Sequence, residues 1–183
     1  PYIAQEAITA IAIKWINGRM VVFGCGDYKR QGDEVYIQCK DEWHLCKKFL
    51  ELWEKECPDI LTGWNIKFFD MPYLVNRFRK IVGEDEAKKL SPWKYISERK
   101  TVVMNKEQIA YTFEGVATLD YLELYRWYAP DGKRQENYRL DTIAEAELGK
   151  NKLSYDEYDN LHQLYKLNFQ KFIEYNIVDV NLI

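Results

Sequence analysis

Hydrophobic and polar positions alternate in short segments at the start of the chain. Apolar residues alternate or cluster over 7–15 and 18–26, on either side of an Asn17-Gly18 pair that is typical of a two-residue hairpin turn. A further short apolar run over 34–39 predicts a third strand. The start of the chain is therefore expected to form a hairpin and one more strand.

Helical spacing follows, over residues 41–59 and again over 70–85. The first pattern predicts a helix that begins at an Asp41 N-cap and is stopped by Pro58. Its apolar positions are Trp43, Leu45, Cys46, Phe49, Leu50, Leu52 and Trp53. The apolar residues of 59–65, between the two patterns, predict a short buried strand.

The second half of the chain is predicted to be a β-hairpin followed by helices. A hairpin that runs into a strand is expected over 97–120. Helices are expected over 121–129, 138–149 and 161–183, the last as one long helix or a pair. This order predicts an α/β or α+β layered domain with helices covering a central sheet. In such sheets, sites gather where strands end and helices begin.

The composition of the 183 residues is that of a folded globular protein, with 47% hydrophobic and 15% aromatic residues. A formal net charge of −3 provides no general basic surface, so any nucleic-acid role must depend on a local site. Four cysteines without a CxxC pair, and only two histidines, argue against a zinc site and a disulfide framework. We therefore expect reduced thiols in a cytoplasmic protein, with no membrane-spanning run and no signal peptide.

The segment TGWNIKFFDMP, residues 62–72, lies where a predicted strand meets a predicted helix. Asp70 has two interpretations there. It is an N-cap, since Asp is favoured at that position and suits the positive end of the helix dipole, or it is a metal ligand. Taken alone, the N-cap is favoured by about two to one. The interpretations are compatible, because one carboxylate can lie beside both a helix start and a cation.

Tyr175 and Asp179 form a second candidate pair, spaced i, i+4 on one face of the final helix. They flank its apolar stripe, which places them at the edge of a core, where a site could lie. Considered alone, an ordinary boundary tyrosine that bonds one turn away is the simpler explanation. Asp120 and Glu123 follow a strand and are interpreted as a helix cap and a solvated first-turn acid, with a site role as the weaker alternative.

Carboxylates would suit the hydrolysis of a phosphodiester. Two divalent cations about 3.5–4 Å apart can activate a water and stabilise the leaving oxygen. Mg²⁺ and Mn²⁺ prefer carboxylate oxygens to thiolates or imidazoles, so a cluster of three or four Asp or Glu side chains is needed. A tyrosine hydroxyl could orient the water, and Asn and aromatic side chains could hold a frayed single-stranded end.

Two motifs resemble those of the family B DNA polymerases. TGWNIKFFDMPYL is similar to the family's second exonuclease motif, with Asn65, Phe69 and Asp70 at its core positions. YNIVDV is similar to the third, with Tyr175 and Asp179. The segments GVATLDYLELY and YRLDTIAEAELGKNKL resemble the family's sequences between these two motifs. The likeness covers nearly the whole chain and is greatest to the replicative polymerases of T-even-type phages.

The resemblance implies a ribonuclease H-like (DnaQ-like exonuclease) fold, with a mixed sheet flanked by helices and a β-hairpin insertion. It implies a 3′–5′ proofreading exonuclease that acts on single-stranded or frayed primer ends with two Mg²⁺ or Mn²⁺ ions. It also implies the remainder of a polymerase polypeptide as a partner, a sliding clamp through the full-length protein, and the cytoplasm of an infected bacterial host.

By the same resemblance, individual residues have expected roles. Asp179 is expected to bind a metal directly, and Asp70 to hold the second metal partly through water. Tyr175 is expected to orient the attacking water. Asn65 and Phe69 are expected to contact the terminal nucleotides.

The hairpin near residues 99–114 resembles the strand-separating hairpin of phage polymerases. Arg99 and Lys106 would suit contacts with the DNA backbone there. An ordinary charged hairpin edge explains either residue alone at least as well.

One departure from the family matters: its first motif, Asp-x-Glu on the first strand, is absent. Glu6 stands before the second strand in no such pattern and is not a substitute. The chain is thus expected to be a single exonuclease-domain fragment, 1–183, that begins after the first motif, lacks the first strand and ends within the helix of the third motif. We expect it to bind metal weakly and to show little nuclease activity alone. The alternatives are a catalytically inactive DNA-guiding or scaffold domain, and another ribonuclease H-like nuclease.

Overall fold

The computed structural model describes residues 1–103, 106–129 and 137–183, apart from the side chains at 103 and 106. The chain forms two compact units. Unit 1 contains Pro1–Ile8 and Cys46–Arg134, and unit 2 contains Thr9–Leu45 and Gln135–Ile183. One of the boundaries between the units, after Leu45, falls within helix α1 (Glu42–Lys55).

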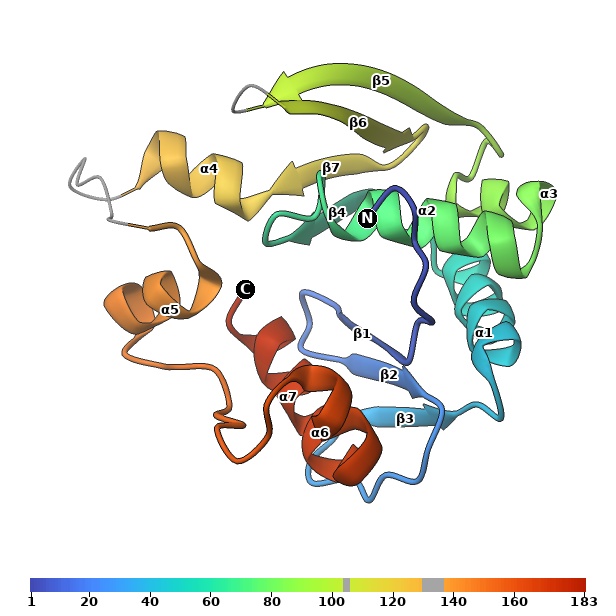
Figure 1. The fold of residues 1–183 in the computed structure, drawn as a ribbon. Coiled ribbons are helices and arrows are strands. Elements are labelled where there is room, and N and C mark those ends of the chain that lie inside the picture. Colours follow the sequence, from blue (N-terminus) through green and yellow to red (C-terminus); the bar gives the residue numbers. More distant parts are fainter. Residues whose placement is uncertain (104–105, 130–136) are drawn as a thin grey trace. The chain divides into compact units, whose positions relative to one another are not determined.

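Unit 2 is built on a three-stranded sheet in the order β1 (Ala10–Lys14), β2 (Met20–Gly24) and β3 (Val35–Gln38) (Figure 1). β1 and β2 are antiparallel, and β2 and β3 are parallel. The predicted hairpin is confirmed, but its turn is wider than two residues. Trp15 N donates to Arg19 O (2.8 Å), and Gly18 has a φ of +87°. This positive φ costs glycine little, which allows the wider turn to close.

The face of this sheet is covered by the C-terminal helices. These are α6 (Leu161–Leu167) and α7 (Phe169–Asn181), and α7 packs on β1 and β2. The buried core residues are Met20, Val22, Leu164, Phe172, Ile173 and Tyr175. The final segment is therefore a helix pair. Asn168 separates its members, because its backbone is not helical and its side chain accepts a hydrogen bond from Lys171 N (3.0 Å).

Gly149 ends helix α5 (Leu140–Leu148) in the left-handed region, with a φ of +61°. A Cβ at this position would meet no atom within 4 Å, so backbone conformation alone disfavours other residues. Gly149→Ala is expected to lower the free energy of unfolding by about 1 kcal/mol, measured by thermal unfolding. Gly149→Asn is the matched control and should cost less, because Asn tolerates this region. Equal losses in the two variants would contradict the explanation.

The described part of unit 1 contains two two-stranded sheets. β4 (Ile60–Gly63) and β7 (Ala117–Asp120) pair in parallel. β5 (Ile96–Val103) and β6 (Lys106–Phe113) form the predicted hairpin, which leads into β7 (Figure 1). Besides the larger part of α1, the helical elements are α2 (Asp70–Ile81), α3 (Glu84–Ala87), the short 3-10 helix η1 (Lys88–Leu90) and α4 (Tyr121–Tyr128).

Aromatic rings form the centre of unit 1. The Phe49 ring stacks on Trp53 with 5.5 Å between centroids and meets Phe78 edge-on at 5.6 Å. Trp53 in turn meets Phe113 edge-on at 6.3 Å. The Trp53 indole N–H, which would be costly to bury alone, donates to Leu90 O (2.8 Å). These contacts hold α1, α2 and β6 together.

The predicted mixture of helices and strands is confirmed. The expectation of one central sheet is not met, because the described strands form three small sheets of three, two and two strands. The predicted Asp41 cap is confirmed: Asp41 Oδ1 accepts from His44 N (2.9 Å), and α1 ends at Lys55, before Pro58.

Candidate functional site

A cluster in unit 2 brings together Tyr175, Asp179 and a lysine that follows α5. The Lys152 ammonium donates to Asp179 Oδ2 (2.9 Å) and to Tyr175 Oη (3.2 Å). Its nitrogen also lies 5.3 Å from the centre of the Tyr175 ring. One cation therefore fixes the two side chains that lie one turn apart on α7.

The chain around Lys152 is itself held in place. The Lys152 backbone N–H donates to Asp141 Oδ1 (2.8 Å), on the first turn of α5. Tyr155, three residues later, places its ring edge-on against Tyr175 with 5.4 Å between centroids. The segment that carries Lys152 therefore contacts both α5 and α7, which fixes where the lysine lies.

This cluster is largely removed from water. The side chains of Lys152 and Asp179 are 27% and 28% exposed, and Tyr175 belongs to the buried core of unit 2. Tyr175 therefore lies deeper than the edge position expected from the sequence. Burial raises the pKa of the Tyr175 hydroxyl, and the Asp179 charge adds to the shift, so this group stays protonated at neutral pH.

Asp179 carries an oxygen that the cluster leaves unsatisfied. Its Oδ1 is buried and has no hydrogen-bond partner among the described residues. Burial raises the pKa of the Asp179 carboxyl above its ordinary value, although the Lys152 ammonium opposes the shift. A buried carboxylate oxygen without a partner is costly, and a hard divalent cation is the kind of group that would satisfy it.

In unit 1, two of the four residues predicted to contact DNA, Asn65 and Phe69, lie on the connection between β4 and α2. Asn65 has a φ of +60°, in the left-handed region that Asn tolerates better than most residues. Its carbonyl accepts from Phe68 N (3.3 Å) and Phe69 N (3.1 Å). The chain therefore turns tightly at Asn65 and enters α2 directly.

Asp70 is the first residue of α2, and its side chain is exposed. The N-cap interpretation of Asp70 is wrong, because Phe69 occupies the N-cap position and no side chain of the described residues caps the helix. A carboxylate in the first turn still suits the helix dipole. The Phe69 side chain is 54% exposed, which is unusual for a phenylalanine and leaves its ring accessible for stacking.

Asp120 ends β7 and is only 4% exposed. Its Oδ1 accepts from Leu122 N (3.0 Å), which confirms the predicted cap of α4. Asp120 Oδ1 also accepts from Asn65 N, and Oδ2 accepts from Lys67 N, each at 3.0 Å. Glu123, predicted to be solvated, instead pairs with the Lys67 ammonium at 3.0 Å, although both side chains remain more than a third exposed.

The structure says less about Arg99 and Lys106, the two hairpin residues expected to contact DNA. Arg99 is exposed on β5, opposite Ala110 of β6. Lys106 begins β6, but its side chain lies outside the described part of the structure. The backbone contacts expected of both residues stay predictions.

The described residues contain no group of three or more His, Cys, Asp or Glu side chains that could hold a metal ion. Asp70 and Asp179 lie in different units. Across the same residues, no helix is both long enough and apolar enough to cross a bilayer.

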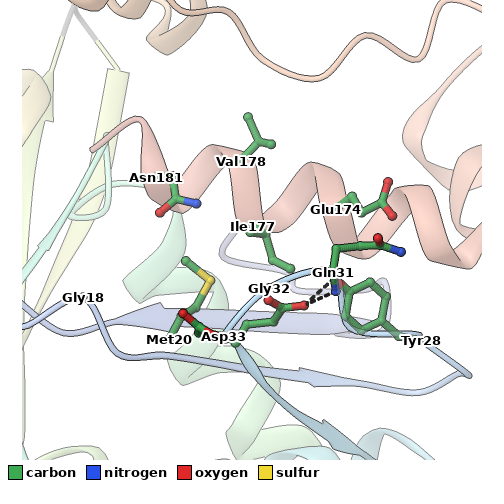
Figure 2. Close-up of a pocket in the computed structure, with 11 residues that line it drawn as sticks. Gly18, Met20, Tyr28, Gln31, Gly32, Asp33, Glu174, Ile177, Val178 and Asn181 are labelled. Carbon is green, nitrogen blue, oxygen red and sulfur yellow. Dashed lines mark hydrogen bonds between the residues drawn. The ribbon is translucent and has the colours of Figure 1, made fainter.

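A pocket of about 450 Å³ lies elsewhere on unit 2, against another face of α7 (Figure 2). Glu174, Ile177 and Asn181 line it from the helix, and Met20 and Tyr28 line it from the sheet side. None of the predicted site residues is among its lining residues, so the candidate site is not this concavity.

Sequence reasoning missed Lys152 and the wider role of Asp120. Lys152 stands in a polar segment, and its partner Asp179 is 27 residues away, so no local pattern signals the pair. Asp120 had a local signal as a cap, but its bonds to Asn65 and Lys67 span 55 and 53 residues.

Comparison with known proteins agrees with the family that the two motifs indicate. Residues 5–143 match the family described as DNA polymerase family B, exonuclease domain. The chain is 38% identical to the DNA-directed DNA polymerase of Escherichia phage RB69 and 36% identical to that of Enterobacteria phage T4, each over 80% of this chain. A DNA polymerase catalytic subunit of Elephantid herpesvirus 1 is 30% identical over 66% of the chain.

The alignments cover 16% of the length of each phage polymerase and 11% of the herpesvirus protein. The family match ends before Lys152, Tyr175 and Asp179, so these three residues enter the site through the geometry of unit 2 and the YNIVDV motif. The match nevertheless covers most of the chain and includes the whole of TGWNIKFFDMP. The chain therefore belongs to the exonuclease-domain family of the family B DNA polymerases.

Proposed function

We propose that this chain acts as the 3′–5′ proofreading exonuclease domain of a phage-type family B DNA polymerase. Its reaction is the hydrolysis of the 3′-terminal phosphodiester of single-stranded DNA. The observation that carries the proposal is the Lys152 cluster, in which a mostly buried carboxylate with one unsatisfied oxygen lies one turn from a neutral tyrosine hydroxyl. Such an arrangement suits a site that holds a cation and positions a water.

Asp179 and Asp70 would hold Mg²⁺ or Mn²⁺, which supplies an activated water and stabilises the leaving oxygen when bound. Their oxygen donors fit a hard cation. Asp179 offers the buried Oδ1, and Asp70 offers an exposed carboxylate at the start of α2. The chain lacks an Asp-x-Glu pair, so we expect the site to be incomplete and metal binding to be weak.

The other residues position the reactants. The Tyr175 hydroxyl, held by Lys152, orients the attacking water. Lys152 keeps Asp179 and Tyr175 in fixed rotamers. Asn65 and Phe69 hold the terminal nucleotides, with the exposed Phe69 ring stacking on a base.

The finer structural expectations belong to the same proposal. We infer a ribonuclease H-like fold, supported by the antiparallel β1–β2 pair and the parallel β4–β7 pair. The chain is proposed to be one exonuclease-domain fragment, 1–183, of a longer polymerase polypeptide. Its partners would be single-stranded or frayed primer DNA, the rest of that polypeptide and, through the full-length protein, a sliding clamp. Its place would be the cytoplasm of an infected bacterial host.

The proposal is tested by comparing the chain with a version extended upstream by a strand that carries Asp-x-Glu. Both are incubated with Mn²⁺ and a 5′-labelled single-stranded oligodeoxynucleotide, and products are resolved by size. We expect stepwise removal of 3′ nucleotides by the extended version and little by the chain alone, because two of the four carboxylates are then missing. An extended version that binds the oligonucleotide but never cleaves it would favour a DNA-guiding domain without catalysis.

A further inference from the structure

Asp120 has more hydrogen bonds than a helix cap requires. An N-cap side chain normally accepts from one backbone amide of its own helix. Asp120 accepts from Leu122 N in this way, and also from Asn65 N and Lys67 N of the distant β4–α2 connection. All three bonds are 3.0 Å long and end on a side chain that is nearly fully buried. The cap accounts for the first bond but not for the other two.

The two additional bonds hold the backbone at Asn65, whose conformation is strained. Asn65 is left-handed, with a φ of +60°, and the amides that reach Asp120 belong to Asn65 itself and to the residue two places later. Fixing both amides on one carboxylate fixes the backbone on each side of the Asn65 side chain. Bonds to a charged acceptor are the stronger ones, so this anchor is well suited to hold an unfavourable conformation.

We propose that Asp120 is a positioning residue for the DNA end, acting through the turn that carries Asn65. This inference rests on the proposed function, in which Asn65 contacts a terminal nucleotide. Asp120 is buried and its oxygens are engaged with backbone amides, so it acts on DNA only by setting where the Asn65 side chain lies. The Lys67–Glu123 ion pair ties the same turn to α4, but its exposed side chains make it a weak tether.

Three substitutions separate the possible roles of Asp120. Asp120→Ser keeps a good N-cap for α4, but a single short hydroxyl cannot reach both Asn65 N and Lys67 N. Asn65→Gly removes the side chain and keeps the left-handed backbone, which glycine adopts without strain. Glu123→Gln is the control, because it weakens the Lys67 tether and leaves the Asp120 bonds in place.

Binding is measured by the fluorescence of 2-aminopurine at the 3′ end of a single-stranded oligodeoxythymidylate, with EDTA present so that no cleavage occurs. We expect Asp120→Ser and Asn65→Gly each to weaken binding about tenfold, since a small misplacement of a contact is costly. In the Asn65→Gly background, Asp120→Ser should add less than about twofold, because the two residues act through one contact. Glu123→Gln should change binding little.

Amide hydrogen exchange provides a readout that does not depend on DNA. Asp120→Ser should speed exchange at Asn65 N and Lys67 N and leave Leu122 N protected. Unchanged exchange at Asn65 and Lys67 would overturn the inference, as would an equal loss of binding with and without the Asn65 side chain. If Asn65→Gly leaves binding unchanged, the proposed DNA contact of Asn65 fails, and Asp120 has no contact to position.

Discussion

Asp179→Asn, made in the upstream-extended version, is expected to slow removal of 3′ nucleotides by at least about 100-fold. Loss of a residue that only supports a metal ligand already costs about 10–100-fold, and Asp179 is proposed to be a ligand itself. The substitution keeps the shape of the side chain and lets Lys152 keep an oxygen acceptor. Because the substitution leaves the Lys152 ammonium without an anion, activity is compared at a temperature well below the Tm of both versions, so that the lost activity reports the metal site and not the fold.

Glu174→Gln is the matched control for this experiment. Glu174 lies on α7 with Asp179 and loses the same charge on substitution, but it lines the separate pocket of unit 2. Its activity should stay close to that of the unsubstituted protein. Mn²⁺ binding measured by calorimetry should fall in Asp179→Asn and not in Glu174→Gln. Equal activities in the two variants would show that Asp179 has no role in the reaction.

Lys152→Met is expected to destabilise the chain by about 2 kcal/mol, which corresponds to a fall of about 4–8 °C in Tm. The methionine fills a similar volume, but Asp179 then keeps a mostly buried charge with no cation beside it. Breaking a fully buried pair in this way costs about 3–5 kcal/mol, and the 28% exposure of Asp179 reduces the penalty. The loss is measured by thermal unfolding followed by circular dichroism.

Two further variants test the cause of that loss. Lys150→Met makes the same change at an exposed position of the same segment and should leave Tm nearly unchanged. Adding Asp179→Asn to Lys152→Met should recover most of the stability, because it removes the unpaired charge. If Lys152→Met and Lys150→Met have the same Tm, the Lys152–Asp179 bond contributes nothing to the stability of the fold.

Local patterns were sufficient to predict most elements of this chain. The hairpin around Gly18, the α1 helix with its Asp41 cap and the β5–β6 hairpin all follow from residues that lie close together in sequence. The arrangement of strands into three small sheets could not be predicted in this way. Pairings such as β4 with β7 join segments more than fifty residues apart, and no local period encodes them.

Local sequence likewise predicts only part of the candidate site. Tyr175 and Asp179 share a helix face because of their spacing, which the sequence shows directly. Helix α2 begins at Asp70, as the sequence predicted, but the N-cap interpretation of Asp70 was wrong because Phe69 occupies that position. The left-handed turn at Asn65 leads into α2 and is held by the Asp120 carboxylate, 55 residues away, a contact that no local pattern shows. The contribution of Lys152 is likewise visible only after folding brings it to α7.

The division of the chain into units has a consequence for its synthesis on the ribosome. The β1–β3 sheet emerges first, but the helices that cover Met20 and Val22 begin only at Leu161. At typical rates of translation, the apolar face of that sheet waits on the order of ten seconds for its cover. Cys46–Arg134, the continuous stretch of unit 1, emerges during this interval. Nascent unit 2 is thus the part that a chaperone would meet in an open state.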